Sequence, residues 1–73
     1  MKWKFKTKDL ETVCETPKEV MDLVLVALGC NNPSEATDSQ VSKATSVGLW
    51  CAIIASPGET FPYGNNKFEV TAV

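Results

Sequence analysis

The chain has 73 residues, of which 44% are apolar and 22% charged, and its formal net charge is −2. This length fits one small domain, so we expect residues 1–73 to form a single α+β domain. The chain has no His, which is the commonest general base and metal ligand. All seven basic residues are Lys, so the chain also has no Arg, whose planar guanidinium group binds phosphate and guanine through two hydrogen bonds. We therefore expect no enzyme activity and no cofactor.

The cysteines and the N-terminus bear on the cellular location. Cys14, Cys30 and Cys51 are widely spaced and odd in number, so they predict free thiols rather than disulfides or a metal site. The sequence contains no run of about 18 apolar residues, the length needed to span a membrane. The first ten residues alternate Lys with aromatics, unlike a secretory signal. We expect a cytoplasmic protein, which for a viral protein means the host cytoplasm.

The N-terminal residues predict a β-hairpin. Residues 2–6 alternate Lys with aromatic side chains, which is the period of a half-buried strand. Residues 11–15 fit as the antiparallel partner across a loop at 7–10. The predicted register pairs Lys6 with Glu11, Lys2 with Glu15, Trp3 with Cys14 and Phe5 with Thr12.

Residues 16–29 predict a helix with defined ends. Thr16 suits the N-cap, Pro17 the first helical position and Glu19 the third position of a capping box. Gly29 suits a left-handed cap at the end. Val26 falls on the polar side of this helix, so we consider it as a contact residue.

The later segments are less clearly defined. Thr37 and Gln40 predict a second, short helix that ends at Gly48. Residues 49–56 are apolar on both alternating faces; we predict a strand, while continuation of the helix is the alternative. In residues 67–73, apolar and polar side chains alternate, which predicts a half-buried strand.

The loop at 57–66 places Phe61 and Tyr63 among Gly, Pro and Asn, which is typical of a recognition loop or of rings folded over the sheet edge.

Together these segments predict a four-stranded antiparallel sheet with two helices on one face, in the order ββααββ. In this arrangement Trp50 and Ile54 point into the open face of the sheet. Large apolar residues on an open face are usually covered by a partner. We therefore expect a homo-oligomer, most simply a homodimer, or a protein partner bound there.

Two segments resemble a known family. Residues 15–23 (ETPKEVMDL) and 68–73 (FEVTAV) are similar to parts of the small RNA polymerase inhibitor of T7-like bacteriophages, which has a strand pair, a helix that opens with Glu-Thr and a closing Phe-Glu-Val-Thr strand. A long insertion separates the two segments here, and Ala72 and Val73 stand where the family has arginines. The resemblance implies a small viral protein that acts by binding a host protein.

Three functions stand as hypotheses. The first is a non-enzymatic module that inhibits a host enzyme or defence factor by covering its surface. The second is an oligomeric binder of a nucleotide-type signal, and the third, less expected, is a nucleic-acid binder. The residues predicted to make protein contacts are Phe61, Tyr63, Trp50, Ile54 and Val26; those for the small ligand are Tyr63, Asn65 and Asn66; those for nucleic acid are Lys2, Lys4, Lys6 and Lys8.

Overall fold

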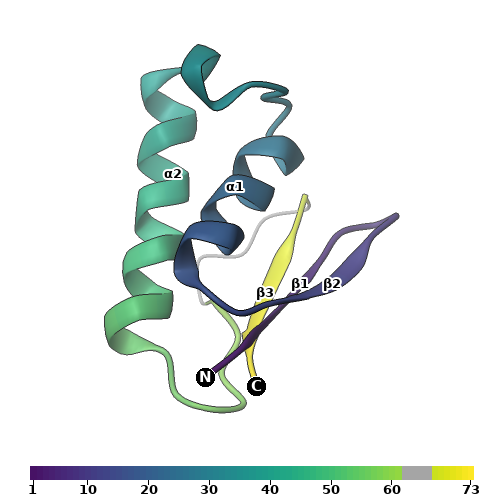
Figure 1. Ribbon diagram of the computed structural model, residues 1–73, viewed down its shortest axis with the longest axis vertical. Coiled ribbons are helices and arrows are strands. Elements are labelled where there is room, and N and C mark those ends of the chain that lie inside the picture. The colour runs from purple at the N-terminus through teal and green to yellow at the C-terminus, as the bar shows by residue number, and fades with distance from the viewer. Residues whose placement is uncertain (62–66) are drawn as a thin grey trace.

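The computed structural model describes residues 1–61 and 67–73, and these residues form three strands and two principal helices (Figure 1). The elements are β1 (Trp3–Lys6), β2 (Glu11–Cys14), α1 (Pro17–Ala27), the 3₁₀ turn η1 (Pro33–Glu35), α2 (Asp38–Leu49), the π-helical turn η2 (Trp50–Ile54) and β3 (Glu69–Ala72). In the described part of the chain, no helix has the length and apolar character needed to cross a bilayer. The α+β class is confirmed.

The sheet is antiparallel, with the strand order β2-β1-β3. The β1–β2 hairpin has the predicted register, with Trp3 opposite Cys14 and Lys6 opposite Glu11. Trp3 and Cys14 are buried, whereas Lys6 and Glu11 are exposed. The alternation of side chains therefore sets the two faces of the hairpin as predicted.

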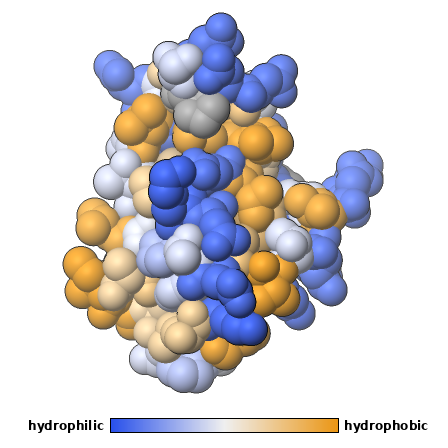
Figure 2. Space-filling model, viewed as in Figure 1, coloured by the Kyte–Doolittle hydropathy of each residue, from blue (hydrophilic) through white to orange (hydrophobic). Residues whose placement is uncertain are grey.

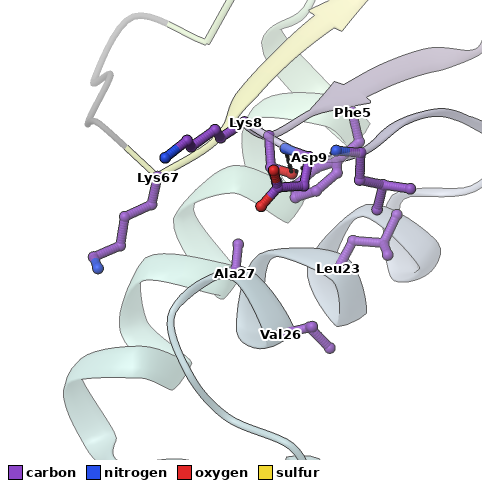
Figure 3. Close-up of a pocket in the computed structure, with 9 residues that line it drawn as sticks. Phe5, Lys8, Asp9, Leu23, Val26, Ala27 and Lys67 are labelled. Carbon is purple, nitrogen blue, oxygen red and sulfur yellow. Dashed lines mark hydrogen bonds between the residues drawn. The ribbon is translucent and has the colours of Figure 1, made fainter.

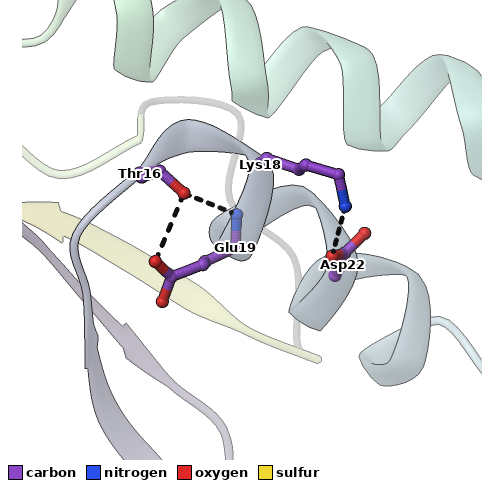
Figure 4. A network of polar contacts seen from close by, with 4 residues as sticks. All are labelled: Thr16, Lys18, Glu19 and Asp22. Atoms are coloured by element: carbon purple, nitrogen blue, oxygen red, sulfur yellow. Dashed lines mark hydrogen bonds and ion pairs between the residues drawn. The ribbon is translucent and has the colours of Figure 1, made fainter.

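Helix α1 begins and ends where its sequence predicts. Thr16 is the N-cap, and its hydroxyl accepts the backbone N–H of Glu19 at 3.2 Å (Figure 4). The same hydroxyl donates to Glu19 Oε1 at 3.3 Å. The Glu19 carboxylate thus binds the Thr16 hydroxyl and not the Thr16 N–H, so the predicted capping box is only half formed. Lys18 Nζ pairs with Asp22 at 3.2 Å on the exposed side. After the helix, Gly29 has a φ of 94°, which glycine adopts without the steric cost of a Cβ.

Helix α2 begins as predicted but does not end at Gly48. Thr37 and Gln40 form a reciprocal capping box, with bonds of 2.8 and 3.2 Å. The helix runs through Gly48 to Leu49, and α1 lies so close at Gly48 that a methyl group there would overlap Sδ of Met21. Gly48 is therefore a site of helix–helix packing, and its interpretation as a helix stop is wrong.

The predicted strand at residues 49–56 is also wrong. Leu49 is the last residue of α2, and Trp50–Ile54 continue as a π-helical turn. The Ala55 N–H donates to the Trp50 carbonyl at 2.8 Å, five residues back, which is the π-helical pattern. A short apolar run has no period that separates strand from helix, and the well-capped α2 supplies a helix to extend. The four-stranded sheet and the order ββααββ are therefore contradicted.

In place of a fourth strand, residues 58–61 cover the outer edge of β3. We call them the covering segment. A β-bridge joins Thr60 to Thr71, and the two hydroxyl oxygens lie 3.1 Å apart. The backbone hydrogen bonds are Gly58 N–H to Ala72 O (2.7 Å), Ala72 N–H to Glu59 O (2.8 Å) and Phe61 N–H to Val70 O (2.8 Å).

The core lies between the sheet and the helices. In Figure 1 both helices are on the same side of the sheet, with α1 against the strands and α2 against α1. Phe5 of β1 stacks on Phe68 with ring centroids 5.8 Å apart. The residues that fill this core are Trp3, Phe5, Cys14, Val20, Val24, Leu25, Cys30, Ala44, Val47, Trp50, Cys51, Phe61, Phe68, Val70 and Ala72.

Candidate functional site

Three large apolar side chains are exposed together at the end of α2. Leu49 is 53% exposed, Ile53 76% and Ile54 64%. They are close in sequence and lie on one helical end, where Figure 2 shows hydrophobic surface at the lower left. We call these three residues the apolar cluster. An exposed group of this kind on a small, charged protein is typical of a protein-binding surface.

The π-helical turn explains why the apolar cluster faces outward. Trp50 and Cys51 are each 4% exposed and point into the core. The Trp50 ring meets Phe61 of the covering segment edge to face, with centroids 5.5 Å apart. The wider π turn thus directs two successive side chains inward and leaves Ile53 and Ile54 outside. Turns of this kind are rare and occur often at functional sites.

A groove lies between the hairpin loop and α1. It has a volume of about 420 Å³. Figure 3 shows Leu23, Val26 and Ala27 of α1 on one side, with Phe5 and the loop residues on the other. The remaining lining residues are Thr7, Lys8, Asp9, Leu10 and Lys67. The groove is open and mainly apolar, as expected for a surface that receives a side chain rather than enclosing a small molecule.

The predicted protein-contact residues fall into three groups. Ile54 and Val26 are exposed, one in the apolar cluster and the other in the groove. Trp50 and Phe61 are buried against each other, so the placement of Trp50 on an open sheet face is corrected. The prediction of a recognition role for Tyr63 lies outside the described residues, as do the ligand contacts Asn65 and Asn66.

The predicted lysine row does not form a uniformly basic face. Lys2 Nζ lies 3.6 Å from Glu15 Oε1, and Lys4 Nζ lies 4.0 Å from Glu11 Oε1. Lys6 is exposed beside them, while Lys8 belongs to the groove. The alternating charges weaken the attraction of this face for a nucleic-acid backbone.

The three cysteines are buried free thiols. Burial, and to a smaller extent nearby Cys14, raises the pKa of Cys51 from 9.0 to about 11. Burial, then the Glu19 carboxylate, raises the pKa of Cys14. The Cys30 Sγ donates to the Asn32 carbonyl at 2.9 Å. Raised pKa values keep Cys14 and Cys51 as neutral thiols, which are poor nucleophiles and metal ligands. The described residues contain no group of three or more His, Cys, Asp or Glu placed to hold a metal ion.

Sequence reasoning missed Leu49 and Ile53. A strand over residues 49–56 would place both on its inner side, where they would be buried. In the helical alternative, Leu49 lies four residues after Thr45 and four before Ile53, a spacing that places them on one face. The sequence, however, predicts Val41, Ala44 and Thr45 as the inner stripe of this helix, whereas Val41 and Thr45 are exposed and only Ala44 is buried. The spacing alone therefore could not have identified the apolar cluster.

The chain was compared with protein families, curated proteins and solved structures. No family model, curated protein or solved structure matches this chain at a significant level.

Proposed function

We propose that this protein is a small non-enzymatic binding module whose main contact surface is the apolar cluster. The observation that carries the proposal is the exposure of Leu49, Ile53 and Ile54 beside a π-helical turn whose other large side chain is in the core. Burying apolar side chains against a partner gains about 25 cal/mol per Å² removed from water. These residues replace Trp50 and Phe61 as the contacts, and Ile54 is retained from the sequence prediction.

The mode of action we propose is occlusion of a partner's surface. Three side chains supply only the centre of an interface, since a standard one buries roughly 800 Å² on each partner. The contact therefore extends to neighbouring residues such as Ala52, which is also exposed. Because two segments of this chain resemble the phage polymerase inhibitor, we propose as its partner a host enzyme or defence factor in the cytoplasm. A second copy is the other occupant, which gives a homodimer.

The test compares two lysine substitutions at exposed apolar residues. Ile53→Lys places a charge in the apolar cluster on η2, whereas Val41→Lys changes an exposed residue near the start of α2. Light scattering on the pure protein and capture from host lysate report a homodimer or a partner. We expect Ile53→Lys to lose the complex and Val41→Lys to keep it. Both changes are at the surface, so unfolding free energies should stay within about 0.5 kcal/mol. A complex that survives Ile53→Lys would contradict the proposal.

A further inference from the structure

Among the residues that the structure describes, one edge of the sheet has no neighbouring strand or bridge, and we call it the open edge. On the outer side of β3, the covering segment makes backbone hydrogen bonds to Val70 and Ala72. On the outer side of β2, none of the described residues forms a strand or bridge. An open edge presents N–H and C=O groups that can pair with another extended chain.

The register identifies which backbone groups face outward. The Thr7 N–H donates to the Leu10 carbonyl at 2.7 Å, which makes these two residues a hydrogen-bonded pair. Such pairs recur at every second residue of an antiparallel ladder, so Thr12 and Cys14 turn their backbone groups toward β1. The backbone groups of Glu11 and Val13 therefore point to the open side.

The charges along this edge are acidic. Glu11 and Glu15 lie on the outer face with exposed Val13 between them. Lys4 and Lys2 approach these carboxylates from the β1 side only, at 4.0 and 3.6 Å. A carboxylate has about four acceptor positions, so capacity remains for cations on the open side. In contrast, a second copy paired antiparallel through β2 would bring its own glutamates beside these, and like charges on adjacent strands are destabilising.

The inner side of the same edge is apolar. Leu10 precedes β2 on the face that also carries Thr12 and Cys14, and it is 46% exposed. Leu10 lines the groove together with Leu23 and Val26. A chain that paired with β2 would direct every second side chain to this inner side, toward the rim of the groove.

We propose that β2 binds an extended segment of another protein, which adds to the sheet as an edge strand. The segment carries basic residues opposite Glu11 and Glu15 and apolar residues at the two positions that face inward, next to Thr12 and Cys14. This mode of binding combines main-chain hydrogen bonds with side-chain selection at alternate positions. The inference rests on the proposed function only in that the ligand is a protein; it uses a surface separate from the apolar cluster.

Two synthetic peptides of identical composition test the proposal. The first has the core Lys-Val-Thr-Val-Lys, which puts Lys outward and Val inward in either strand direction. The second, Val-Lys-Thr-Lys-Val, exchanges the two faces while keeping the charge. Each peptide is titrated into the ¹⁵N-labelled protein, and amide shifts and hydrogen exchange are followed by NMR. We expect the first peptide to shift and protect the Glu11 and Val13 amides, and to bind at least about tenfold more tightly than the second.

Protein variants separate this site from the proposed function. Glu11→Gln combined with Glu15→Gln should weaken the first peptide about tenfold, whereas Ile53→Lys should bind it as the unmodified protein does. Equal binding of the two peptides, shifts confined to the apolar cluster, or no binding would overturn the proposal. Protection of the Val13 amide that grows with protein concentration would also overturn it, because a second copy would then occupy the edge.

Discussion

The two edges of the sheet are held by different means. The edge at β3 is covered by the chain itself, and the covering segment is fixed by Phe61, whose ring packs on Trp50 in the core. At the edge of β2, none of the described residues forms a neighbouring strand or bridge. This strand is held from the core side by Cys14, which is 1% exposed and contributes to the raised pKa of Cys51.

The comparison shows how a four-residue strand can be ordered without a neighbour on its outer side. A buried anchor and the hairpin register hold β2 in place, so its outward-facing backbone N–H and C=O groups are not needed to order the strand. At β3, the equivalent backbone groups form hydrogen bonds with the covering segment. The open edge is therefore the one at which backbone recognition of a partner is possible.

The largest effect is expected when the anchor of the covered edge is removed. Phe61→Ala empties the site against Trp50 and should cost about 3–5 kcal/mol of unfolding free energy, measured by urea titration. The covering segment should also detach, so the Ala72 amide should exchange faster. Leu49→Ala is the control, because this exposed side chain should change stability by at most about 0.5 kcal/mol. A loss below about 1 kcal/mol for Phe61→Ala would show that Phe61 is not the anchor.

How much the sequence could predict depends on how local each signal is. The hairpin register rests on neighbouring charges and a two-residue period, so the pairing of residues 3–6 with 11–14 could be predicted, although Glu11 forms its ion pair with Lys4 and not with Lys6. The start of α1 rests on Thr16 and Glu19, three positions apart. Both signals act within a few residues, and the structure confirms both.

The segment around η2 depends on contacts that are distant in the chain. Gly48 packs closely against Met21 of α1, and the buried ring of Trp50 packs against Phe61. Neither contact is visible in a local pattern, so the strand prediction fails and the apolar cluster is only partly found. Ile54 is exposed, but for a different reason than the sequence suggests, since it lies on a helical turn and not on a sheet.

A smaller effect is expected at high pH from Cys51, the buried thiol of η2 that contributes, with the Cys14 anchor of the open edge, to the core. The Cys51 thiol ionises near pH 9.0 when unfolded, whereas burial raises its pKa to about 11 in the folded protein. Between these values the unfolded state holds fewer protons, so stability falls as pH rises, by up to about 1.4 kcal/mol per pH unit. Below pH 9 this contribution is fully present.

Urea titrations at pH 8, 9, 10 and 11 measure this loss. Cys51→Ala is the matched variant, because it lacks this thiol but retains every other ionisable group. We expect the variant to show a shallower decline above pH 9. Parallel declines for the two proteins would mean that Cys51 ionises alike in the folded and unfolded states.

The smallest effect on stability is expected from the charges of the open edge. Glu11→Gln removes the ion pair with Lys4, whose Nζ is 4.0 Å away and whose side chain is 44% exposed. Exposed pairs of this kind contribute from about 0 to 1 kcal/mol, and a long distance favours the low end. The free energy of unfolding, measured by urea titration, should therefore change by less than about 0.5 kcal/mol, and this change should depend little on salt. A loss above about 1 kcal/mol would assign Glu11 to the stability of the hairpin. A negligible loss, together with weaker binding of the basic peptide, would mean that the same carboxylate contributes to recognition and hardly to folding.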